Sequence, residues 1–61
     1  MDRENVFKYS VEILQQTNDG DDLQSQDLKL VEGAVNGFLT ERGYVVLYKL
    51  WHDVTEGIYA K

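Results

Sequence analysis

The sequence predicts a small all-α domain of three helices, on three observations. Apolar residues recur at spacings of three and four over most of the 61-residue chain, which is the period of an amphipathic helix. Proline is absent, so helix ends must be marked by Gly, Asn and Asp. Such residues stand at 18–22 and at 43, where they divide the chain into three segments. We expect one domain over residues 1–61, near the lower size limit for a single core.

The first helix is predicted over residues 2–17. Asp2 and Glu4 place negative charge in its first turn, where the helix dipole favours it. One stripe at helical spacing consists of Val6, Tyr9, Ile13 and Leu14. The run Asn18-Asp19-Gly20 predicts the end of this helix, because Asn and Gly tolerate the left-handed backbone of a helix terminus.

The second helix is predicted from about residue 25 to residue 42, after a polar loop in which only Leu23 is apolar and is expected to pack beneath the helix. Either Ser25 or Asp22 could be its N-cap. Its apolar seam consists of Leu28, Val31, Val35 and Phe38, and Arg42 continues the same spacing.

Glycines decide the shape of this second helix. Gly43 is predicted to end it in a left-handed turn, with Tyr44 packed against Leu39. Gly33 and Gly37, four residues apart, have two interpretations: they admit a second backbone at close range, or they break the helix.

The third helix is predicted over residues 44–57, forming an antiparallel hairpin with the second around a very short turn. Its polar residues lie on one narrow face: Lys49, His52, Asp53 and Glu56. The alternative is a β-strand over Tyr44–Trp51, which is rich in Val, Tyr and Trp. Helix is favoured because the segment does not alternate between polar and apolar residues.

The third helix has more apolar surface than two short helices can cover. The chain has no cysteine, so neither disulfides nor a thiolate metal site can stabilise it, and self-association is the remaining route. We therefore predict a homo-oligomer, with a dimer favoured. The predicted contact residues are Val45, Tyr48, Trp51 and Ile58.

The charge balance suggests a different class of function. Six Lys and Arg residues against eleven Asp and Glu residues give a net charge of −5, which argues against direct binding to nucleic acid. The alternative hypothesis is an acidic decoy that imitates nucleic acid. The residues that would form its surface are Asp19, Asp21, Asp22, Asp27 and Glu32.

Other functions have little support in the sequence. His52 and Glu56 supply only two ligands on one helical face, too few for a metal site. The acidic loop lacks the spacing of a calcium-binding loop, since Gln24 and Leu30 stand where Gly and Glu are required when Asp19 is position 1. No nucleophile context or phosphate loop is present, so we expect no enzyme and no cofactor. Without a signal segment or a long apolar run, a cytoplasmic protein that does not enter membranes is expected.

The run Leu30-Val31-Glu32-Gly33-Ala34-Val35-Asn36-Gly37-Phe38-Leu39-Thr40-Glu41-Arg42-Gly43, within residues 22–44, resembles short proteins encoded by phages and prophages. The resemblance covers the middle third of the chain and brings no active residues with it. It implies an accessory protein of a mobile element that binds a host or phage protein. The uncovered apolar surface of the third helix predicts a small non-enzymatic protein–protein interaction module that self-associates, and the resemblance adds the role of modulating a host or phage protein.

Overall fold

The computed structural model describes residues 5–59, which form three α-helices: α1 (Val6–Gln16), α2 (Ser25–Val35) and α3 (Glu41–Thr55). No strand occurs within residues 5–59. The prediction of a small all-α, three-helix domain is confirmed, and so is the preference for helix over strand at residues 44–51.

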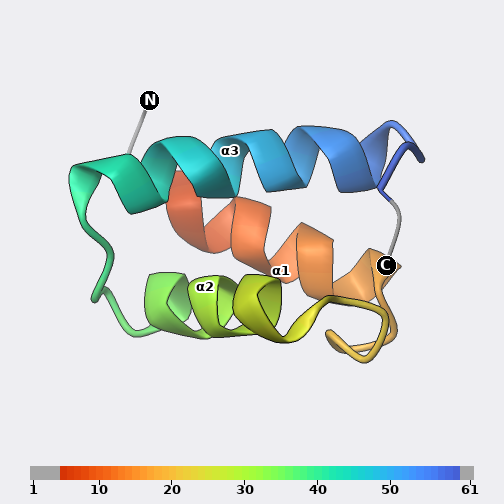
Figure 1. The fold of residues 1–61 in the computed structure, drawn as a ribbon, viewed down its shortest axis with the longest axis horizontal. Helices are drawn as coiled ribbons and strands as arrows, with labels where there is room; N and C mark the ends of the chain where they lie inside the picture. Colours follow the sequence, from red (N-terminus) through yellow and green to blue (C-terminus); the bar gives the residue numbers. More distant parts are fainter. Residues whose placement is uncertain (1–4, 60–61) are drawn as a thin grey trace.

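The helices α2 and α3 run antiparallel as a hairpin, and α1 lies diagonally behind them (Figure 1). The predicted hairpin is confirmed, although its connection is longer than expected and comprises residues 36–40. The helix α3 packs more extensively against α1 than against its neighbour in sequence, α2. The closest pairing in the fold therefore joins the first and the last helix.

Apolar side chains from all three helices and from the first loop form the core. Its buried members are Val6, Ile13, Leu23, Val31, Ala34, Leu47, Leu50 and Val54. Two buried hydroxyls, those of Ser10 and Thr17, donate to main-chain carbonyls one turn earlier, at 2.9 Å and 2.6 Å. Within residues 5–59 no buried side-chain nitrogen or oxygen lacks a hydrogen-bond partner, so the core has no uncompensated polar group.

The end of α1 follows the sequence prediction closely. Asn18, Asp19 and Gly20 all have positive φ angles, of 54°, 57° and 88°, and the Asp19 N–H donates to the Leu14 carbonyl at 2.8 Å. Leu23 is buried in the core as predicted. The predicted start of the helix, with Asp2 and Glu4 in its first turn, lies outside the described residues, and α1 begins at Val6 within them.

The start of α2 differs from the prediction. Neither Ser25 nor Asp22 is the N-cap: Ser25 is the first helical residue, and Gln24 precedes it in extended conformation with no side-chain capping bond. The Gln24 N–H instead donates to the Tyr59 hydroxyl at 2.9 Å. The sequence predicts a cap from a neighbouring side chain, whereas the Gln24 N–H is bound by a side chain 35 residues away.

The end of α2 was placed too late, and the predicted turn at Gly43 is wrong. The helix stops at Val35, where Gly37 has a φ of 75°, the Gly37 N–H donates to Ala34 and the Phe38 N–H donates to Gly33. Of the two interpretations of Gly33 and Gly37, the helix break is therefore correct. The predicted seam failed beyond this point, because Phe38 is 84% exposed and Arg42 belongs to α3.

Gly43 lies in the first turn of α3, which begins at Glu41 rather than at 44. The Thr40 hydroxyl accepts the Gly43 N–H at 3.1 Å and so caps this helix. Leu39 does not pack in a helix-ending contact with Tyr44. Its side chain instead lies over Gly33 and Gly43, where a Cβ atom added to either glycine would come within 3.3 Å of Leu39.

The third helix ends at Thr55, two residues before the predicted end at 57, and the chain turns at Gly57. Gly57 has a φ of 75°, its N–H donates to Val54 at 3.2 Å, and the Ile58 N–H donates to Asp53 at 3.0 Å. This is the same pair of bonds that ends α2, the Schellman pattern that a left-handed glycine permits. It turns the chain back toward α2 and places Tyr59 near the start of that helix.

Candidate interaction surface

One side of α3 is exposed along most of the length of the helix. Glu41, Val45, Tyr48 and His52 follow one another at spacings of four, three and four residues, so they lie along one line, called the outer stripe below. All four are exposed, Val45 by 64% and Tyr48 by 45%. The outer stripe is therefore apolar in its middle and polar at both ends.

Tyr48 is held in place by two other rings. Its ring centroid lies 5.7 Å from that of Tyr9 on α1, in an edge-to-face arrangement, and 5.6 Å from that of Trp51. Tyr9 and Trp51 are closer still, at 4.5 Å. Such ring pairs are favourable beyond the apolar area that they bury, so Tyr48 is ordered before any partner arrives.

Trp51, a predicted contact residue, lies in the interface between two helices of the chain. It is half-buried, and its indole N–H donates to the Glu12 carboxylate on α1. This bond and the stacking on Tyr9 connect α3 to α1. Trp51 therefore holds α1 and α3 together, and it supports the outer stripe through its contact with Tyr48.

Ile58 is 65% exposed but lies apart from Val45 and Tyr48, the apolar middle of the outer stripe. It follows the turn at Gly57, beyond the last residue of α3. At 1.5 Å per helical residue, Val45 lies about 15 Å along the axis from the end of α3. The structure thus brings Val45 and Tyr48 together, and it places Ile58 at a separate position.

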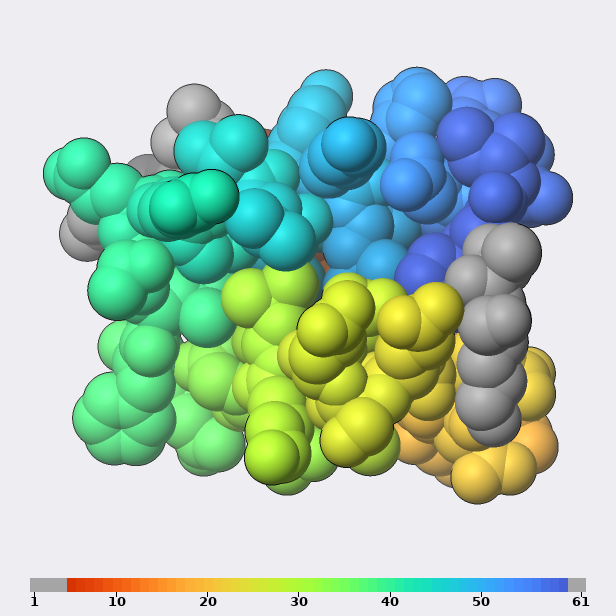
Figure 2. Space-filling view, in the orientation of Figure 1, coloured from red at the N-terminus to blue at the C-terminus, as the bar shows by residue number. Residues whose placement is uncertain are grey.

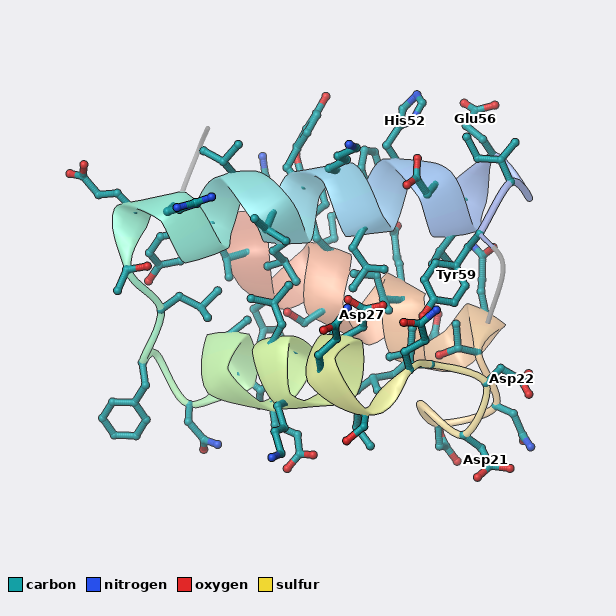
Figure 3. All side chains as sticks on the ribbon, viewed as in Figure 1. Asp21, Asp22, Asp27, His52, Glu56 and Tyr59 are labelled. Carbon is teal, nitrogen blue, oxygen red and sulfur yellow. The ribbon has the colours of Figure 1, made fainter. Side chains whose placement is uncertain are left out.

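The residues of the predicted acidic surface are only partly gathered. Asp19, Asp21 and Asp22 are exposed in the loop between α1 and α2, at the same end of the molecule as Glu56 (Figure 3). Asp27 is half-buried and accepts a hydrogen bond from the Tyr59 hydroxyl at 2.7 Å. Glu32 is exposed in the second half of α2, away from the loop.

Tyr59 connects the end of the described chain to α2. Its hydroxyl accepts from the Gln24 N–H and donates to Asp27, so one oxygen binds both the N-cap residue and the first turn of α2. Its pKa is raised from 10.0, chiefly because its partial burial disfavours the charged phenolate. The Gln24 N–H acts in the opposite direction, while the bond to Asp27 and the charge of that carboxylate raise the pKa further.

Replacing Tyr59 with Phe is expected to lower the free energy of unfolding by about 1 kcal/mol, the usual worth of such hydrogen bonds. Because the folded-state pKa lies above the unfolded value, the Tyr59 contribution is complete below pH 10.0 and is lost as pH rises above it. The difference between the wild type and Tyr59→Phe should therefore shrink at high pH. Urea denaturation at pH 7 and above pH 10 measures it, and a constant difference would contradict this account.

Two depressions adjoin Tyr59. One, of about 320 Å³, lies between the first loop and the end of α3 and is lined by Gln16, Thr17, Asp22, Val54, Gly57 and Tyr59. The other, of about 180 Å³, lies in the hollow between α2 and α3 and is lined by Asp27, Val46, Lys49, Leu50, Asp53 and Tyr59 (Figure 2).

His52 and Glu56 project outward from α3, away from the core (Figure 3). The nearest charged partner of His52 is Asp53, with 3.7 Å between Nδ1 and Oδ1. Across residues 5–59, no three side chains of His, Asp or Glu stand close enough together to bind a metal ion. None of the three helices is long and apolar enough to cross a membrane.

Three residues that hold the helices together, Tyr9, Glu12 and Tyr59, were not predicted as contact residues. Tyr9 was assigned to the helix stripe and Glu12 was not singled out, yet both bind Trp51. Tyr59 lies beyond the predicted third helix, yet its hydroxyl binds the start of α2. No local pattern marks these contacts, because each joins residues more than thirty positions apart. Comparisons of the chain with protein-family models, with curated proteins and with solved structures give no match.

Proposed function

We propose that this protein is a small non-enzymatic interaction module of the cytoplasm that self-associates through the outer stripe of α3. One observation carries the proposal: Val45 and Tyr48 are adjacent, exposed and apolar, and Tyr48 is ordered by Tyr9 and Trp51. Rigid aromatic residues make good contact anchors, because little side-chain entropy is lost on binding. Exposing 64% of Val45 to water is unfavourable, and a partner surface would cover this apolar area.

The test is sedimentation equilibrium of the wild type and of Val45→Lys over a concentration series. Wild type is expected to form a dimer that dissociates on dilution, and Val45→Lys is expected to remain monomeric, because a charge in the centre of the contact is desolvated. A helical circular dichroism spectrum of the variant would show that the fold is kept.

Val46→Lys is the matched control. Val46 is the next residue, has the same side chain and is 44% exposed, but it lies toward α2 at the edge of the smaller depression. We expect this variant to dimerise like the wild type. A monomeric wild type at all concentrations, or equal loss of dimer in both variants, would overturn the proposal.

A heterologous partner is the second part of the proposal. The resemblance of residues 22–44 to short phage and prophage proteins suggests that a host or phage protein is bound and modulated. The first loop supports an alternative, an acidic decoy for a nucleic-acid-binding protein, since Asp19, Asp21 and Asp22 are all exposed at one end. Salt separates the two: a decoy loses affinity steeply as ionic strength rises, and an apolar contact does not.

A further inference from the structure

We infer that the partner of α3 is α3 of a second copy of this chain, in antiparallel orientation, with Val45 against Tyr48 and Glu41 against His52 across the contact. This inference rests on the proposed self-association and specifies its geometry. Three features of the molecule support it: the order and spacing of the outer stripe, the distribution of charge along the chain, and the position of the acidic loop.

The spacing of the outer stripe is symmetric about its midpoint. Its intervals of four, three and four residues read the same in both directions, with the midpoint between residues 46 and 47. When two copies meet antiparallel at that midpoint, each residue of the stripe faces another member of the stripe. This is the self-complementary contact that a two-fold axis requires. It also has the spacing of a coiled-coil seam.

The chemistry of the facing residues is complementary in this register. At the centre, Val45 of each copy packs against Tyr48 of the other copy, which removes both pairs of exposed apolar side chains from water. At each end the Glu41 carboxylate faces the imidazole of His52, which has a ring N–H to donate to it. The His52 side chain is 54% exposed, so a second copy can reach it, although its Nδ1 also lies 3.7 Å from the Asp53 carboxylate.

Other registers bring like residues together. A parallel pair places each stripe residue opposite its own copy, so the two Glu41 carboxylates meet. An antiparallel pair centred two residues further along α3 faces Glu41 with Glu56, again two carboxylates. Both arrangements add repulsion that the proposed register avoids.

The acidic loop also favours the antiparallel arrangement. The first loop lies beside the C-terminal end of α3, where Asp22 and Gly57 line the same depression. Because the midpoint lies in the first half of α3, the two C-terminal ends are about 25 Å apart in the pair. This exceeds the Debye length of about 8 Å at physiological salt, so the two sets of carboxylates are screened from each other.

Cysteine cross-linking tests the register directly, because the chain contains no cysteine of its own. In the double variant Glu41→Cys/His52→Cys, the thiol at position 41 of one copy faces the thiol at position 52 of the other copy. Within one helix the two positions lie about 16 Å apart. Mild oxidation is expected to give a covalent dimer, about tenfold more than in either single variant, since the paired thiols have a high effective concentration. Mass spectrometry of the digested dimer should find a disulfide between the cysteine at position 41 of one copy and the cysteine at position 52 of the other.

The matched control is Arg42→Cys/Asp53→Cys, which keeps the interval of eleven residues but moves both thiols to another side of α3. It should cross-link no more than the single variants, and helical circular dichroism spectra should show that every variant folds. Equal cross-linking of the control, or strong cross-linking of Glu41→Cys alone, would overturn the antiparallel register. If the wild type still dimerises and Val45→Lys does not, the proposed function stands and only the register fails. A monomeric wild type removes both.

Discussion

Replacing Trp51 with alanine is expected to lower the free energy of unfolding by about 3–5 kcal/mol, a large part of the total. The substitution removes the stacking on Tyr9 at 4.5 Å, the contact with Tyr48 and the bond to Glu12, which together join α3 to α1. Truncating a packed Trp costs about 3–5 kcal/mol. A domain of this size has a total stability of roughly 3–9 kcal/mol, so the loss is comparable with the whole.

Far-UV circular dichroism during urea denaturation measures this change, since Trp51 is the only tryptophan and its fluorescence disappears with it. Trp51→Phe is the control, because it keeps a ring beside Tyr9 and removes only the indole N–H. We expect Trp51→Phe to lower the free energy of unfolding by about 1–2 kcal/mol, which includes the loss of the hydrogen bond to a carboxylate. A Trp51→Ala protein as stable as the wild type would show that the contact between α1 and α3 is not what stabilises the fold. Because Trp51 stabilises the fold itself, a Trp51 variant does not test the proposed dimer contact.

Gly20→Ala is expected to destabilise the protein by about 2–5 kcal/mol. The residue has a φ of 88°, where a side chain costs about 1–2 kcal/mol. An added Cβ would also lie 2.6 Å from a Leu28 methyl carbon and 3.2 Å from one of Leu14, and such overpacking costs about 1–3 kcal/mol. The midpoint of urea denaturation at unchanged slope measures the sum.

Gly37→Ala separates the two contributions to this effect. Gly37 has a similar φ of 75°, but no atom lies within 4 Å of the position that its Cβ would take. Only the backbone strain applies, so we expect a cost of about 1–2 kcal/mol. Equal destabilisation by the two substitutions would show that Leu14 and Leu28 move aside without cost.

The sequence predicts the number and type of helices well, because both depend on periodicity that is local. It places the boundary between the second and third helices wrongly for a physical reason. Val35 and Phe38 continue the helical period of apolar residues, yet both are exposed, and hydrophobicity alone does not reveal burial. The correct signals were present, with Asn36-Gly37 as a stop and Thr40 as a cap three residues before Gly43.

The candidate surface is predictable only in part. Val45 and Tyr48 stand out because they are apolar residues on the same side of α3 as His52. The assignment of Trp51 depends on Tyr9 and Glu12, and Glu12 is 39 residues away. Which side of α3 packs on α1 is decided by the fit between two helices, and this fit is a property of the pair rather than of either segment.

The dominance of the contact between α1 and α3 has a consequence for synthesis of the protein. While the chain emerges from the ribosome, α1 and α2 are made first, but the helix that covers most of the apolar side of α1 is made last. Short helices without a packing partner are marginal in water. The nascent chain should therefore remain largely unstructured until residues as far as Thr55 have emerged, after which the helices form and pack in one cooperative step.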